Sequence, residues 1–243
     1  MADEESNGRQ PELDEHNGVQ DGDQAQENTA DPPATDAGED HRGEALFRAR
    51  LRSRQMDGSD FTGASLPRAE LNKVTLQRAL CEDADLSGVQ MTHVDLTDAV
   101  LQGADLRGAT LNNVNLNGAD LTGADLTGAS LKGVKLSKSR CKDACFVGST
   151  LETVEFEEAV LDGAEFDGAE VEGPTFKKVT FKDVSFQGFR AAQCVLECCT
   201  LDGCDLCGAT LDTLLVKEGL LRDCQLGGAL FSGAKFRGVD LQE

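Results

Sequence analysis

The chain has 243 residues, with 23 Lys and Arg against 44 Asp and Glu, a net charge of −21 and neither Trp nor Tyr. The surplus of negative charge and the shortage of stacking side chains argue against direct binding of DNA or RNA. No apolar run reaches 18 residues and the first residues lack the apolar centre of a secretory signal, so we expect no contact with a membrane and a soluble, cytoplasmic protein.

Residues 1–44 are predicted to be a disordered acidic tail. The first 45 residues hold 14 Asp and Glu against two Arg, with hardly any apolar residues between them. Such a segment cannot bury enough apolar surface to fold alone. Two interpretations of its charge stay open: a solvating tail, or an arm that mimics or repels nucleic acid.

Residues 45–58 differ from the tail, because apolar and basic residues alternate there. The apolar residues are Leu46, Phe47, Leu51 and Met56, and the basic ones are Arg48, Arg50, Arg52 and Arg54. We predict a short capping segment, helical and amphipathic, that covers the open strand edges of the repeats that follow. The arginines have two further interpretations, a patch for an anionic partner and a contact that holds the acidic tail.

From Phe61 to Leu241 a large apolar residue falls on every fifth position, and 34 of these 37 residues are Leu, Phe, Met or Val. A second series of small residues lies two positions earlier, from Ser59 to Val239. A period of five matches neither a strand nor a helix, so it indicates a repeat architecture. The inward phase survives if three residues are extended and the next two turn a corner.

Longer spacings give the number of sides in each coil. Val recurs in the small position at Val74, Val94 and Val114, and corner glycines recur every 20 residues from Gly88 to Gly228. Four pentapeptides therefore close one coil, and equivalent residues stack directly above one another. At Phe189-Arg190-Ala191 the large and small positions are exchanged with little change in total volume, so we expect the core to repack there.

The repeats "ADLSG", "ADLRG", "ADLTG", "VNLNG" and "VDLTD" resemble the pentapeptide-repeat family, whose pattern is A(D/N)LXX. The resemblance covers residues ~57–243. It implies an all-β fold, a right-handed quadrilateral parallel β-helix. We expect this solenoid to occupy residues 59–243 in about nine coils.

The nine cysteines are predicted to be thiols in or on the solenoid. Six occupy inward positions, where a reduced Cys acts as a small apolar residue: Cys81, Cys141, Cys194, Cys199, Cys204 and Cys224. Cys204 and Cys224 stack one coil apart, near enough for a disulfide, although a cytosolic setting favours thiols. Cys204 and Cys207 should diverge, inward and outward, so we predict no metal site.

The repeats offer no recognisable catalytic set. The chain has three His, of which two lie in the tail and His93 falls on a corner, so no His-based nucleophile activation can be assembled. There is no phosphate-binding GxxxxGK[ST] motif. We predict that the protein is not an enzyme and has no cofactor.

These patterns predict a non-enzymatic solenoid that presents flat acidic faces to a protein partner, itself basic or DNA-binding. The candidate contact residues are the longest acidic column and its extension: Asp85, Asp105, Asp125, Glu165, Asp167 and Asp205. The resemblance implies an alternative, because some pentapeptide-repeat proteins mimic DNA and inhibit DNA gyrase, which gives quinolone resistance or self-protection. The partner would then be a type II topoisomerase. Against this, the unbroken register excludes the long projecting loops of the plasmid-borne resistance proteins.

Overall fold

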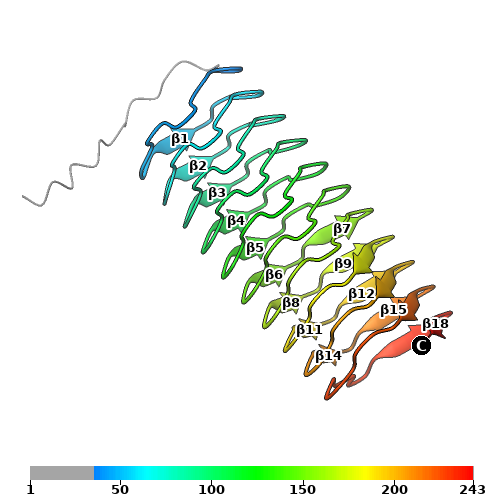
Figure 1. Cartoon of the computed structure of the whole chain (residues 1–243). Helices are drawn as coiled ribbons and strands as arrows, with labels where there is room; N and C mark the ends of the chain where they lie inside the picture. The colour runs from blue at the N-terminus through cyan, green and yellow to red at the C-terminus, as the bar shows by residue number, and fades with distance from the viewer. Residues whose placement is uncertain (1–35, 243) are drawn as a thin grey trace, which may run out of the picture.

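The computed structural model describes residues 36–242, which form one rod of stacked coils (Figure 1). Paired residues on neighbouring coils are 20 apart, as in the pairs Arg50↔Glu70 and Asp85↔Asp105, and every strand pair is parallel. The described residues contain strands, bridges and turns but no helix, in about ten coils. The predicted quadrilateral parallel β-helix is confirmed, and it has one coil more than expected.

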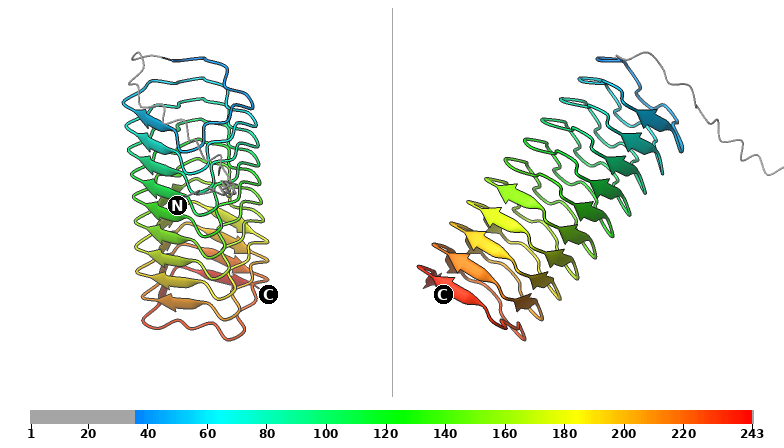
Figure 2. Two further views of the ribbon diagram at one scale, coloured as in Figure 1. Left: turned by 90° about the vertical axis from the view of Figure 1, so that its left-hand side faces the viewer. Right: turned by 180° about the vertical axis from the view of Figure 1, so that it is seen from behind.

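We number the four sides of the rod by their outward residues at intervals of 20. Side 1 starts at Arg50, side 2 at Gln55, side 3 at Asp40 and side 4 at Ala45. In each repeat the outward residue is followed by a large inward residue and then by two corner residues, for example Arg50, Leu51, Arg52 and Ser53. We count the two corner residues with the side that they end. Figure 2 shows the strands of side 1 stacked along the rod.

The strands are three residues long, with the large residue of each repeat in the middle. Side 1 carries a nine-stranded sheet: β1 (Arg50–Arg52), β2 (Glu70–Asn72), β3 (Gln90–Thr92), β4 (Thr110–Asn112), β5 (Ser130–Lys132), β6 (Thr150–Glu152), β8 (Glu170–Glu172), β11 (Arg190–Ala192) and β14 (Thr210–Asp212). Side 2 has five strands: β7 (Glu155–Glu157), β9 (Thr175–Lys177), β12 (Val195–Glu197), β15 (Leu215–Lys217) and β17 (Lys235–Arg237). Side 3 has four strands: β10 (Thr180–Lys182), β13 (Thr200–Asp202), β16 (Leu220–Arg222) and β18 (Asp240–Gln242). Single-residue bridges join the coils along side 4 and in the first half of sides 2 and 3.

The interior is a continuous stack of the two inward series. On side 4 the rings of Phe146, Phe166 and Phe186 lie above one another, with centroids 4.7 and 5.4 Å apart. The exchanged pair repacks as expected, because Phe189 and Ala191 are both buried and the Phe189 ring meets Phe186 edge-on at 5.1 Å. The core is therefore shared between coils, which is the source of solenoid stability.

Every second corner residue between 38 and 238 has positive φ, whether or not it is Gly. Twenty-one of them are Gly and twenty are other residues, so half of the corners accept a conformation that costs an L-residue about 1–2 kcal/mol. Packing between coils, rather than local preference, holds these corners.

A corner carboxylate also restricts the coil that follows. The Asp143 side chain lies over Gly163, so that a Cβ at Gly163 would be 2.2 Å from its Oδ1. The same contact joins Asp83 to Gly103 and Asp183 to Gly203. At these three corners, a side chain in place of the glycine would force the Asp carboxylate 20 residues earlier to move.

The N-terminal segment corrects two of our expectations. Residues 45–58 form no helix; they continue the pentapeptide register, with Leu51 and Met56 buried and β1 paired to β2. Residues 36–44, assigned to the tail, form the start of the first coil, where the Asp36 N–H donates to the Gln55 carbonyl at 2.8 Å. The rest of the predicted tail, residues 1–35, lies outside the described residues.

Asp36 and His41 take the first two large inward positions of the first coil, which explains why the apolar pattern does not reveal its start. Asp36 is buried in an ion pair with Arg54. The His41 ring stacks on Phe61 at 4.6 Å, and its Nδ1 is 3.0 Å from Glu44 Oε2. This end of the core is thus covered by polar groups that also reach solvent.

At the other end, the inward residues of the last coil are half-buried or exposed, for example Phe236 at 46% and Leu241 at 72%. Between residues 36 and 242 no helix is long and apolar enough to cross a membrane.

Candidate partner-binding surface

The structure brings the six predicted contact residues together on side 4. Asp85, Asp105 and Asp125 follow one another in a bridged column, and Glu165 and Asp205 continue it beyond Cys145 and Ser185. Asp167 lies at the corner of the same side, where it accepts a hydrogen bond from Ser185 Oγ at 2.5 Å. Whether these residues contact a partner stays a prediction.

Most of these carboxylates already close a corner of the rod. Asp125 accepts a hydrogen bond from the N–H of Thr127, two residues later, at 2.9 Å. Asp85 and Asp205 do the same for Ser87 and Cys207, at 3.1 and 2.9 Å. A short side chain with an oxygen at this distance mimics a backbone turn, which is why Asp and Asn recur in the middle of the repeat.

Arg107 is a basic residue at the corner beside the acidic column, and our site prediction left it out. Its guanidinium donates to both carboxylate oxygens of Asp105 and lies 3.8 Å from Asp125. These hydrogen bonds hold the pKa of the Asp105 carboxyl below its usual value. Asp105 therefore stays ionised at neutral pH, but its charge is largely matched within the rod.

The acidic charge of the described rod is not spread evenly over its four sides. Counting outward and corner residues, sides 1 and 2 each carry equal numbers of acidic and basic residues. Side 4 carries six acidic residues against three basic ones, Arg48, Arg68 and Arg107. Side 3 carries eleven acidic residues, listed here: Asp40, Asp60, Glu82, Asp83, Asp120, Asp143, Asp162, Asp183, Asp202, Asp223 and Asp240. Five basic residues accompany them: Arg42, Arg140, Lys142, Lys182 and Arg222.

Side 3 holds both paired carboxylates and carboxylates without an ion pair. Asp40 pairs with Arg42 at 2.6 Å, and Asp202 pairs with Arg222. Glu82, Asp83 and Asp183 are exposed and have no ion pair among the described residues. Since sides 3 and 4 share an edge, the two together form one acidic surface with a net charge of −9. We call it the acidic surface.

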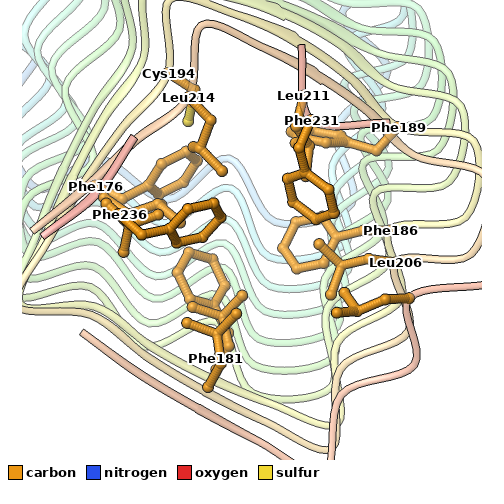
Figure 3. A pocket seen from close by; sticks show the side chains of 15 residues that line it. Phe176, Phe181, Phe186, Phe189, Cys194, Leu206, Leu211, Leu214, Phe231 and Phe236 are labelled. Atoms are coloured by element: carbon orange, nitrogen blue, oxygen red, sulfur yellow. The ribbon is translucent and has the colours of Figure 1, made fainter. Parts of the chain in front are cut away.

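The two hollows of note lie elsewhere. A shallow trough of about 520 Å³ runs along side 1 over β5, β6, β8 and β11, where Lys132 pairs with Glu152 and Arg190 pairs with Glu170. Figure 3 shows the second, a gap of about 40 Å³ between core rings such as Phe181, Phe186 and Phe236. In the described part of the chain, no group of three His, Cys, Asp or Glu side chains could hold a metal ion.

All nine cysteines are free thiols, with Cys204 buried and Cys224 half-buried next to it. Each sulfur donates to backbone carbonyls, Cys204 to Phe181 at 3.3 Å and Cys224 to Arg222 at 3.3 Å. The interaction between the two neighbouring thiols lowers the pKa of Cys224 and raises that of Cys204. Cys198, on side 2, is exposed. Partial desolvation of its sulfur and the hydrogen bond with Glu218 raise its pKa.

We expect iodoacetamide to modify Cys224 before Cys198 at neutral pH, because the thiolate is the reactive form. The measurement is the alkylation rate of each cysteine peptide by mass spectrometry between about pH 6 and 9. The Cys204→Ala variant removes the neighbouring thiol and should move the pH midpoint for Cys224 upward. Faster modification of Cys198 in the wild-type chain would contradict this prediction.

Comparison with known proteins identifies the repeat. Residues 46–80, 75–113 and 115–152 match the family model for pentapeptide repeats, in eight copies. The chain is similar to HetL, a pentapeptide repeat protein involved in heterocyst differentiation regulation from the cyanobacterium Nostoc sp. strain PCC 7120. Their sequences are 26% identical, the match covers 81% of this chain and 89% of HetL, and the TM-score is 0.44.

A trypsin-treated form of QnrB1, a plasmid-mediated fluoroquinolone resistance protein, is 18% identical over 81% of this chain and 91% of QnrB1, with a TM-score of 0.44. With TM-scores below 0.5, neither protein assigns a partner to this chain. No curated protein matches the sequence.

Proposed function

Because the chain belongs to the pentapeptide-repeat family, we propose that it is a non-enzymatic binding rod whose acidic surface receives a basic surface of a protein partner. The observation that carries this proposal is the segregation of charge, neutral on sides 1 and 2 and −9 on sides 3 and 4. We also propose that it acts in the cytoplasm, where unbridged cysteines such as these nine are the rule.

The repeat geometry supports recognition of a cationic partner. Equivalent residues on successive coils are about 4.8 Å apart, so stacked carboxylates repel one another. The repulsion between exposed groups is modest in water, and a basic partner relieves it. The complementary charges would also speed association and fix the side of the rod that is bound.

A DNA-mimicking inhibitor of a type II topoisomerase is the second candidate. It requires negative charge concentrated along one face, and the acidic surface has that arrangement while the opposite sides do not. The same segregation of charge therefore favours this candidate. A supercoiling assay distinguishes a topoisomerase from other basic partners.

Two charge variants test the proposal without disturbing the corners. In the first, Glu82→Gln, Asp83→Asn and Asp183→Asn remove three exposed charges from side 3. In the second, Asp85→Asn, Asp105→Asn and Asp125→Asn remove three from side 4 and keep the side-chain oxygen that each corner needs. The matched control is Glu152→Gln, Glu172→Gln and Asp212→Asn on side 1.

We expect both test variants to lose at least about tenfold in affinity for immobilised poly-lysine and for any partner captured by the wild type, and the control to lose little. If the topoisomerase candidate is correct, inhibition of supercoiling by purified DNA gyrase should also be weakened in both test variants and be nearly unchanged in the control. An equal loss in all three variants would mean that total charge decides binding, and the proposed surface would be wrong.

A further inference from the structure

The first two coils carry a basic patch, which is unusual on this acidic rod. It lies on side 1 and on the corner between sides 4 and 1. Its members are all exposed: Arg48, Arg50, Arg52, Arg68 and Lys73. Beyond Arg68 this corner holds only glycine, from Gly88 to Gly228, so the arginines are confined to one end. We call these five residues the N-terminal basic patch.

The described residues supply a single carboxylate to this patch. Glu70 Oε2 lies 3.3 Å from Arg50 Nε and 3.9 Å from Arg52 Nη2. Arg48 stacks over the Phe47 ring, with its guanidinium carbon 4.9 Å from the centroid. Within residues 36–242, Arg48, Arg68 and Lys73 have no ion pair. Three exposed cations without an ion pair among the described residues leave room for an anionic occupant.

The same chain contains a segment of opposite charge that joins the rod near the patch. Residues 1–35 hold ten Asp and Glu and one basic residue, Arg9. They join the rod at Asp36, which pairs with Arg54 and whose N–H donates to the Gln55 carbonyl. Gln55 is three residues from Arg52, so the junction lies at the corner beside the patch. An extended chain covers about 3.3–3.6 Å per residue, so Asp31 is within roughly 18 Å of the junction.

We propose that the acidic segment 1–35 docks on the N-terminal basic patch of its own chain. The acidic surface repels the segment, and the patch is the concentration of positive charge nearest to the junction. A covalent tether raises the local concentration of the segment to the millimolar range, which favours it over a separate anion. The docked segment shields the patch from other polyanions. This inference is independent of the partner proposed for the acidic surface.

Small-angle X-ray scattering of the full chain tests the proposal, because docking predicts whether the radius of gyration rises or falls when salt is added. The patch variant is Arg48→Gln, Arg52→Gln, Arg68→Gln and Lys73→Gln, and the control neutralises four distant cations: Lys138→Gln, Lys142→Gln, Lys182→Gln and Lys235→Gln. A docked segment is released when salt screens the contact, so the radius of gyration of the wild type and of the control should rise between about 20 and 500 mM NaCl. An undocked acidic segment repels itself less at high salt, so the patch variant should start larger and contract.

Equal radii for the wild type and the patch variant at low salt, or contraction of both, would overturn the proposal. A scattering mass of two chains that falls to one in the patch variant would also overturn it, because the segment would then occupy a second copy. A separate binding experiment uses a heparin hexasaccharide as the probe for the N-terminal basic patch. A variant with the ten acidic residues of 1–35 changed to Asn or Gln should bind it at least about tenfold more tightly than the wild type. Equal binding would show that the segment does not cover the patch.

Discussion

Leu126→Asp should lower the melting temperature by about 10–20 °C, the largest effect that we expect of a single substitution. Leu126 is 1% exposed in the inward column of side 4, between Leu106 and Phe146. The substitution loses about 1.5–3 kcal/mol of apolar burial and adds a carboxylate without a partner, which costs several kcal/mol more. The sum is comparable with the whole stability of a typical domain.

Thermal unfolding followed by circular dichroism measures this effect, and hydrogen exchange locates it. Because each coil contacts only its neighbours, loss of protection should begin in the coils around residue 126 and spread outward. Ser130→Asp is the matched control, since Ser130 is an exposed outward residue of β5. If the two variants melted alike, the alternation of inward and outward residues described above would be wrong.

Phe166→Ala should destabilise the rod by about 3–5 kcal/mol. The Phe166 ring is fully buried, stacks on Phe146 and Phe186, and meets Phe189 edge-on at 6.2 Å. Truncation therefore leaves a cavity between Phe146 and Phe186 and removes ring contacts worth about 0.5–1.5 kcal/mol each. The midpoint of urea unfolding, with the slope checked for constancy, gives the change in the free energy of unfolding.

Phe236→Ala is the control with the same chemistry, because Phe236 in the last coil is 46% exposed. We expect it to cost less than about 1 kcal/mol, since much of its ring already contacts water. Phe166→Leu should recover more than half of the loss by refilling the cavity. Comparable losses at Phe166 and Phe236 would contradict the central role given to the phenylalanine stack.

The five-residue period predicted the solenoid and its inward residues, because the spacing of apolar side chains determines which residues a regular coil can bury. The 20-residue spacing of Val and Gly predicted its four sides. The five-residue period failed at the first coil for a physical reason. Asp36 and His41 occupy inward positions there, so the apolar series is interrupted, and the sequence pattern places Leu46, Leu51 and Met56 in a helix instead. The signal was nevertheless present, since these three residues continue the register of Phe61 without a gap.

The candidate site was predictable in position but not in detail. Residue numbers alone placed Asp85, Asp105 and Asp125 in one column, and the same arithmetic applied to all four sides would have revealed the excess on side 3. The corner hydrogen bonds were harder to foresee, because a capping Asp and a solvated Asp look alike in a sequence. The hint is that Asn replaces Asp in the repeat: Asn115 Oδ1 accepts the N–H of Asn117 at 3.2 Å. The corner needs the oxygen and not the charge.

The contact between a corner Asp and the Gly above it makes the order of the coils matter. Along the corner that ends side 3, Asp143, Gly163, Asp183 and Gly203 alternate, so neighbouring coils are not interchangeable there. Duplicating the 20 residues that contain Asp143 would place its copy on top of it, with a Cβ where the carboxylate lies. Duplicating the 20 residues that contain Gly123 would create no such clash, since a Cβ at Gly123 meets nothing within 4 Å. Lengthening the rod by one coil therefore requires the corner carboxylate to move at some levels and not at others.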